Sequence, residues 1–88
     1  MTAYGAIIRK HKTAFAVVRV KSSVAASMSE TGKALATYEA FFPGMPLVLA
    51  TEGEAGAFEY HGAPALTAVL ASMDPWEIPW REYPRSER

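Results

Sequence analysis

Basic side chains gather in one short polar stretch near the start of the sequence. Arg9, Lys10, His11 and Lys12 are consecutive and separate two apolar runs that have the length of strands. Cationic side chains on a projecting two-stranded ribbon can lie along phosphates or enter a nucleic-acid groove. The opposing interpretation is that lysines at a hairpin tip protect an edge strand from unwanted pairing. The candidate contacts for nucleic acid or another polyanion are Arg9, Lys10, His11, Lys12, Arg19 and Lys21.

The charge of the chain is zero in total but unevenly divided. Residues 1–33 carry six basic side chains and one acidic side chain, a net charge of +5, and residues 34–74 carry −5. Such a division indicates a partner or self-association. Dedicated nucleic-acid-binding domains are strongly basic overall, and this chain is not. Polyanion binding therefore ranks below protein interaction.

The sequence contains few residues that could act in catalysis or bind a metal ion. There is no cysteine, which excludes disulfides, thiolate metal sites and thiol catalysis. A metal site would need both histidines, His11 and His61, together with carboxylates. We therefore expect no metal, no cofactor and no enzymatic activity. The rival hypothesis is an enzyme that uses His61 and nearby glutamates such as Glu59, in the crevice where the strand 57–61 meets the second helix.

The C-terminal stretch is rich in proline and aromatic residues. Residues 75–84 contain two Pro-Trp pairs and a third proline, which favours an extended arm over a helix or a central strand. Its large apolar side chains have more surface area than a small monomer normally leaves exposed to water. We expect them to cover the protein's own core or to form a protein interface or homodimer surface. The candidate interface residues are Trp76, Ile78, Trp80, Arg81 and Tyr83.

The first half of the sequence predicts two strands followed by a helix. Residues 4–9 and 13–20 are apolar runs on either side of the basic stretch, and the second run is apolar on both faces. The helix begins between Ser22 and Ser29, and Ser27 with Glu30 three residues later fits a capping box. Pro43-Gly44 ends it. The apolar stripe of this helix is Ala34, Leu35, Tyr38, Phe41 and Phe42.

The second half repeats this order around an apolar strand. Residues 45–50 are apolar on both faces, which is typical of a strand in the interior of a sheet. A turn over residues 51–56 leads into residues 57–61, whose alternating pattern predicts an edge or half-exposed strand. A second helix begins at Pro64, and its apolar stripe is Leu66, Val69, Leu70 and Met73.

These elements predict an α+β domain with the order ββαββα. The first helix is long enough for a crossover, so strands 13–20 and 45–50 should be parallel, with antiparallel neighbours added by the two hairpins. We expect a four-stranded mixed sheet with both helices on one face. The Trp/Pro-rich arm should lie across the other face or in a groove of a second subunit. A single domain spans residues 1–83, including the arm at 75–83, and residues 84–88 should fray.

The same motifs carry two resemblances. FPG, MPLVLA, EYHGAPALTAVLASM and IPW, in this order within residues 13–83, resemble a group of small uncharacterised bacterial proteins loosely associated with mobile genetic elements. This resemblance implies no activity and no functional residue. Pro46 before its strand, the turn after it, Gly62 and the helix from Pro64 are similar in order to the C-terminal half of thioredoxin-like folds. The paired cysteines of that family have no counterpart here, and a cis bond before Pro46 is left open.

The sequence favours a small non-enzymatic binding or accessory protein that acts through protein interaction or as a homodimer. Polyanion binding through the basic hairpin is the alternative, and an enzyme at His61 is the third hypothesis. No stretch reaches the length of a membrane span and no signal sequence opens the chain, so we expect a cytoplasmic location. The partner, the oligomeric state and the biological process stay open.

Overall fold

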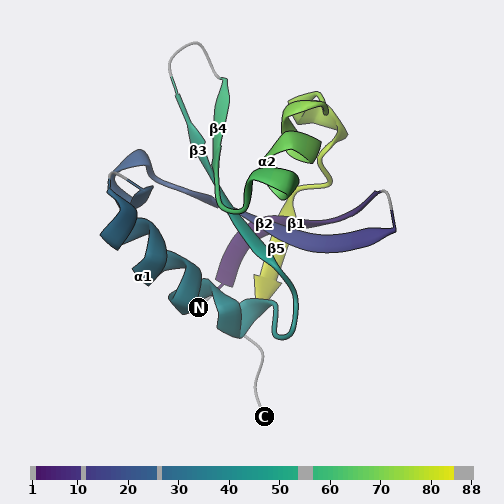
Figure 1. Ribbon diagram of the computed structural model, residues 1–88. Coiled ribbons are helices and arrows are strands. Elements are labelled where there is room, and N and C mark those ends of the chain that lie inside the picture. Colours follow the sequence, from purple (N-terminus) through teal and green to yellow (C-terminus); the bar gives the residue numbers. More distant parts are fainter. Residues whose placement is uncertain (1, 11, 26, 54–56, 85–88) are drawn as a thin grey trace.

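The computed structural model contains a five-stranded mixed sheet with one helix on each face (Figure 1). It describes residues 2–10, 12–25, 27–53 and 57–84. The sheet order is β4-β3-β2-β1-β5. The strands are β1 (Thr2–Lys10), β2 (Thr13–Val20), β3 (Leu47–Glu52), β4 (Phe58–His61) and β5 (Arg81–Pro84). The helices are α1 (Met28–Tyr38) and α2 (Pro64–Ala71), with short 3₁₀ turns at Ser22–Ala25, Glu39–Phe41 and Pro75–Glu77.

β3 is a central strand whose side chains pack into the hydrophobic cores on both faces of the sheet. Val48, Leu49 and Ala50 are completely buried. β3 pairs in parallel with β2, where Val17 lies opposite Val48. It pairs antiparallel with β4, where Leu49 lies opposite His61. Because successive side chains point to opposite faces of a sheet, an interior strand needs apolar partners on both sides. The predicted interior strand and its parallel pairing with β2 are therefore confirmed.

Each face of the sheet has its own hydrophobic core. On one face, Leu70 of α2 and Ile78 pack in a cluster with Val48. On the other face, Ala34 of α1 packs in a cluster with Leu49. The prediction that both helices lie on one face is wrong (Figure 1). The reason is that β2 and β3 are apolar on both faces, so each face must be covered, and α2 covers the face opposite α1.

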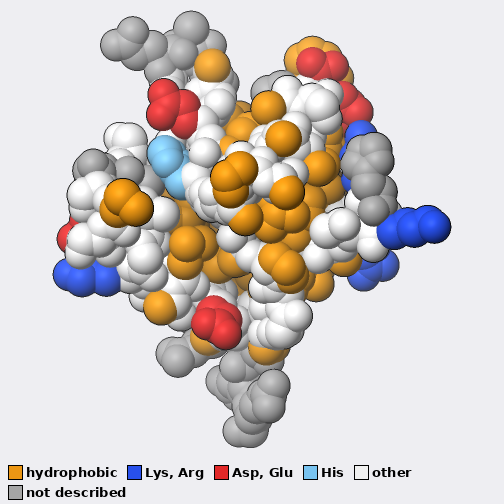
Figure 2. Space-filling view, in the orientation of Figure 1, with side chains coloured by type: hydrophobic (Ala, Val, Ile, Leu, Met, Phe, Trp, Pro, Cys, Tyr) orange, Lys and Arg blue, Asp and Glu red, His pale blue; other side chains and the backbone are white. Residues whose placement is uncertain are grey.

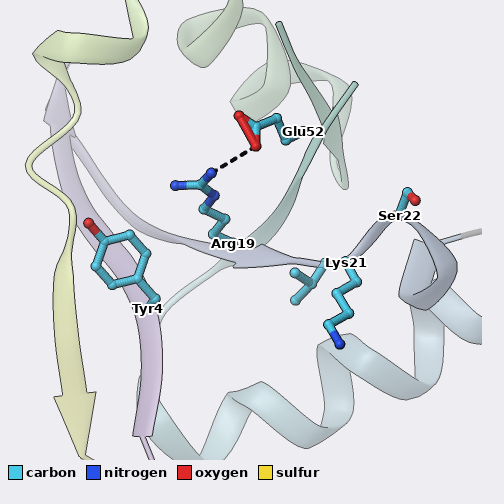
Figure 3. Close-up of a pocket in the computed structure, with 6 residues that line it drawn as sticks. Tyr4, Arg19, Lys21, Ser22 and Glu52 are labelled. Atoms are coloured by element: carbon cyan, nitrogen blue, oxygen red, sulfur yellow. Dashed lines mark hydrogen bonds and ion pairs between the residues drawn. The ribbon is translucent and has the colours of Figure 1, made fainter. Parts of the chain in front are cut away.

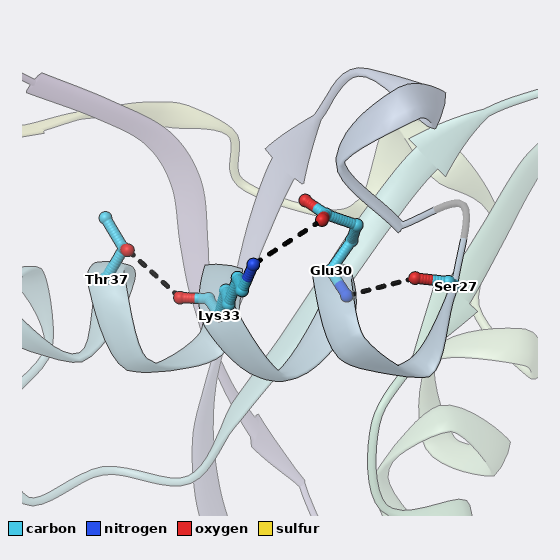
Figure 4. Close-up of polar contacts among 4 residues, drawn as sticks. All are labelled: Ser27, Glu30, Lys33 and Thr37. Atoms are coloured by element: carbon cyan, nitrogen blue, oxygen red, sulfur yellow. Dashed lines mark hydrogen bonds and ion pairs between the residues drawn. The ribbon is translucent and has the colours of Figure 1, made fainter.

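The start of α1 is fixed by the predicted cap (Figure 4). The Ser27 backbone is extended, with φ −145° and ψ 165°, and its hydroxyl oxygen accepts a hydrogen bond of 3.2 Å from the Glu30 amide. The Glu30 carboxylate lies 3.8 Å from Lys33 Nζ, and the Thr37 hydroxyl donates to the Lys33 carbonyl oxygen at 3.0 Å. Such a cap contributes about 1 kcal/mol. The five predicted stripe residues pack in the α1-face core, namely Ala34, Leu35, Tyr38, Phe41 and Phe42. The predicted helix end at Pro43-Gly44 is wrong, because α1 ends at Tyr38 and the chain continues as the 3₁₀ turn Glu39–Phe41.

The C-terminal arm corrects the predicted strand count. Pro75–Glu77 forms a 3₁₀ turn, and Arg81–Pro84 forms β5, which pairs antiparallel with β1. The end of the arm is therefore a fifth strand at the edge of the sheet, whereas Ile78 and Trp80 before it pack on the same face as α2. Pro84, which has no amide to donate, is tolerated because β5 is an edge strand. Fraying was predicted for residues 84–88, but Pro84 ends β5 and lies opposite Thr2, and residues 85–88 lie outside the described residues. The bond before Pro46 is trans.

Replacing Ile78 with alanine tests whether the arm closes the core. Ile78 is only 3% exposed within the α2-face cluster, whereas Trp76 two residues earlier is 81% exposed. We expect Ile78→Ala to lower the free energy of unfolding by about 2–5 kcal/mol, the usual cost of such a cavity. The matched variant Trp76→Ala should change it by about 0.5 kcal/mol or less. Urea denaturation measures both, and equal effects would contradict the assignment.

Candidate interaction site

The basic hairpin residues are divided between the two ends of β2. At the tip of the β1–β2 hairpin, Arg9, Lys10 and Lys12 are exposed, and Lys12 has a positive φ of 62°. They line a shallow hollow of about 340 Å³. Figure 2 shows Lys and Arg side chains gathered at this end of the molecule, on the right of the view. His11 lies outside the described residues. The tip is thus a cationic surface of three described side chains.

Arg19 and Lys21 lie at the other end of β2, where they line a separate hollow of about 380 Å³ with Tyr4 (Figure 3). Most of the length of β2, roughly 20 Å, separates them from the tip. Arg19 donates to Glu52 Oε1 at 3.0 Å, and its guanidinium carbon lies 5.1 Å from the centre of the Phe58 ring. The five described candidate polyanion contacts therefore do not form one surface, and Glu52 balances the charge of Arg19.

Two of the candidate interface residues pack inside the molecule. Ile78 is buried in the α2-face core. Trp80 is half-buried and contacts two rings: it stacks on Tyr4, with a centroid distance of 5.9 Å, and meets Phe58 at a tilt, with a centroid distance of 5.6 Å. Aromatic pairs with ring centroids at these distances attract each other. These two side chains cover the protein's own sheet, as one of the two sequence interpretations expects.

The other three candidate interface residues are more accessible. Tyr83 is half-buried and meets Phe42 edge-on, with a centroid distance of 4.9 Å, on the α1 face. Trp76 and Arg81 are exposed. Trp76 lies beyond α2 and Arg81 begins β5, so the two exposed side chains come from different elements. The exposed side chains of the arm are therefore separated from one another and do not form the continuous aromatic patch that a single interface would need.

β4 lies at the edge of the sheet, as the alternating pattern of residues 57–61 predicted, and this open edge is the strongest candidate for an interaction surface. The Gly53 amide donates to the Ala57 carbonyl oxygen at 2.6 Å, which fixes a hydrogen-bonded pair at the start of the hairpin. Bonded and non-bonded pairs alternate along an antiparallel ladder. Phe58 and Tyr60 therefore occupy non-bonded positions and direct their backbone N–H and C=O groups away from β3. Among the described strands, β3 alone pairs with β4.

The opposite edge of the sheet is better protected. β5 is four residues long, ends at Pro84, and exposes Arg81 and Glu82. Beyond β5, the outer edge of β1 carries Arg9, which lines a hollow together with Trp80. Short strands, prolines and charges are the usual means by which natural sheets prevent edge-to-edge pairing. β4 is equally short and exposes Glu59, but it has neither proline nor a basic Lys or Arg side chain, so its edge is the more receptive one.

A groove follows the β4 edge on the α1 face. Its volume is about 680 Å³, compared with about 340 Å³ for the hollow at the hairpin tip and about 380 Å³ for the one beside Arg19. Met28 at the start of α1 is 93% exposed and provides apolar surface on one wall. The groove therefore joins an unpaired backbone edge to apolar and polar side chains. Its main lining residues are Ser27, Met28, Thr31, Leu35, Tyr60 and His61.

His61 occupies a different position from the one expected for a catalytic crevice. Its Nε2 lies 3.0 Å from the Thr51 hydroxyl oxygen, and Thr51 is only 4% exposed. His61 lies opposite Leu49, whose side chain packs in the α1-face core, so the histidine faces α1 and not the second helix. Glu59 is exposed on the same face of β4 but is not part of the groove lining. The Thr51 hydroxyl orients the imidazole but is too buried to meet a substrate.

Comparisons of the chain with protein-family models, with curated proteins and with solved structures gave no match. Both resemblances drawn from the sequence therefore stay predictions. Within the described ranges, no group of three or more His, Asp or Glu side chains is placed to hold a metal ion. In the same part of the chain, neither helix has the length and apolar character that crossing a membrane requires.

The ionisation of Tyr60 reports on the β4 environment. Burial raises the pKa of the Tyr60 phenol above its ordinary value of about 10. The neutral phenol is thus favoured in the folded protein. Below about pH 10 both states are neutral, and as the pH rises further the unfolded chain ionises first, so stability falls until the folded pKa is passed. We expect Tyr60→Phe to lose less stability than the wild type above about pH 10. Urea denaturation at a series of alkaline pH values measures this, and parallel curves would contradict it.

Proposed function

We propose that the protein is a non-enzymatic interaction module that receives a β-strand from a protein partner along the outer edge of β4. The observation that supports this most directly is the orientation of the Phe58 and Tyr60 backbone groups away from β3. An extended segment placed beside an open edge can pair with these groups and continue the sheet. The contrast with the protected β5 edge also supports β4 as the interacting edge.

The strength of such an interaction depends on more than backbone pairing. Two residues offer two N–H and two C=O groups, and each hydrogen bond contributes about 1 kcal/mol net. Four such bonds give about 4 kcal/mol, which corresponds to a Kd of about 1 mM. The groove beside the edge must therefore supply the additional affinity. Met28, which is 93% exposed, and Leu35 offer apolar surface there for a partner's side chains.

A photo-crosslinking amino acid introduced at Glu59 tests the edge directly. Glu59 is exposed at the middle of β4, so a bound strand would lie within reach of the crosslinker. We expect irradiation of intact cells to produce a defined covalent adduct of higher mass. The matched control carries the crosslinker at Glu82, which is exposed on the protected edge strand β5. Adducts of equal yield from the two positions, or none from Glu59, would contradict the proposal.

Polyanion binding at the hairpin tip is a second candidate function. Its supporting observation is that Arg9, Lys10 and Lys12 are exposed together, and no described acidic side chain lines the hollow they share. A cationic ribbon of this kind neutralises phosphates without reading sequence. Because only three described cations contribute, we expect modest affinity with strong salt dependence.

Replacing Lys10 and Lys12 with alanine tests the hairpin. Each phosphate contact contributes about 0.9 to the slope of log K against log salt concentration on duplex DNA. The double variant should therefore reduce that slope by about 2 and weaken binding at low salt. Fluorescence anisotropy with a labelled duplex measures both quantities. Lys33→Ala, which removes a basic side chain paired with Glu30 on α1, is the control. Affinity that does not change with salt would exclude this function.

A further inference from the structure

We propose that the strand received by β4 is β4 of a second copy of this chain, paired antiparallel across a two-fold axis at Tyr60. This inference rests on the proposed function and names the partner. A two-fold interface brings the same surface of both copies together, so the strand must be complementary to itself. The hydrogen-bond pattern of β4 and its charges together determine which pairing meets this condition.

The outward backbone groups limit the registers that two β4 strands can adopt. A hydrogen-bonded position must lie opposite another hydrogen-bonded position, and on this outer edge those positions are Phe58 and Tyr60. With four residues in the strand, two symmetric registers give substantial overlap. In one register Glu59 lies on the axis, opposite its own copy. In the other register Tyr60 lies on the axis.

The charges on the α1 face distinguish the two registers. When Glu59 lies on the axis, two carboxylates occupy directly opposite positions, which is unfavourable. When Tyr60 lies on the axis, Glu59 of each copy lies opposite His61 of the other, and the favourable pair forms twice. These are non-hydrogen-bonded positions, where opposing side chains approach each other most closely. Charge complementarity therefore selects the register with Tyr60 on the axis.

The surroundings of His61 fit this arrangement. Its Nε2 already lies 3.0 Å from the Thr51 hydroxyl, which fixes the ring and leaves Nδ1 to meet a carboxylate of the second copy. On the other face the two Tyr60 rings meet next to Phe58, whose own ring lies 6.4 Å from that of Tyr60. Four residues per copy form a small interface, so the dimer is weak and its population depends on concentration.

Two complementary charge variants test the proposal. His61→Glu places a carboxylate opposite Glu59 of the second copy, and this new carboxylate can still accept a hydrogen bond from Thr51. Glu59→Lys places an ammonium group opposite His61 of the second copy. Each variant alone should dimerise at least about tenfold more weakly than the wild type, because a favourable pair is replaced by a like-charged or unmatched one.

An equimolar mixture of the two variants should recover the association as a heterodimer. In that heterodimer the introduced carboxylate lies opposite the introduced ammonium group, and the unchanged Glu59 of one copy lies opposite the unchanged His61 of the other. Sedimentation equilibrium measures the dissociation constants, and native mass spectrometry distinguishes the heterodimer from the two homodimers.

The controls separate folding, register and partner. Circular dichroism confirms that each variant is folded, and Glu82→Lys, on the far edge, should dimerise as the wild type does. A dimer that His61→Glu does not weaken would show a different register or surface and overturn the inference. A wild type that stays monomeric at every concentration would also overturn it. In that case, a crosslinked adduct from Glu59 with another protein would leave the proposed function standing, and its absence would remove both.

Discussion

The complete burial of β3 between two cores is the constraint on which the rest of the structure depends. Val48 and Ala50 face α2, and Leu49 faces α1, so the strand is stabilised only when both faces of the sheet are covered. A chain of 88 residues has few apolar side chains with which to build two hydrophobic cores. The protein meets this need by placing one helix on each face and by adding Ile78 from the C-terminal arm to the α2 side.

The same constraint explains why β4 is left at the edge. α1 joins two adjacent parallel strands on one face, and after β4 the chain passes over the opposite face as α2 before it reaches the far side of the sheet as β5. β5 then pairs with β1 and protects that edge along residues 2–5. No described segment returns to β4. The open edge thus follows from the route that covers both faces, and it is not a local defect of the β3–β4 hairpin.

The sequence predicted the features that depend on local patterns. The buried strand follows from an apolar run on both faces, and the start of α1 follows from Ser27 three residues before Glu30. The strand count failed because Arg81–Pro84 has no apolar alternation of its own and becomes a strand only by pairing with β1. Which face of the sheet α2 covers depends on how the chain turns after β4. The outward direction of the Tyr60 backbone groups depends on which positions of the β3–β4 ladder are hydrogen-bonded. Residue types do not encode either property locally.

In the proposed dimer, Glu59 and His61 have opposite effects on the pairing of a second strand with the β4 edge, and together they limit the registers that this strand can adopt. A carboxylate in the middle of a four-residue strand repels a second strand that brings another carboxylate opposite it. In the register that we propose, shifted by two residues, that carboxylate instead lies opposite His61, whose Nε2 is within hydrogen-bond distance of Thr51. A shift of one residue would set bonded positions against non-bonded ones, so the backbone and the charges must agree at the same time. In the proposed dimer, two side chains and one hydrogen-bond phase therefore favour a single register.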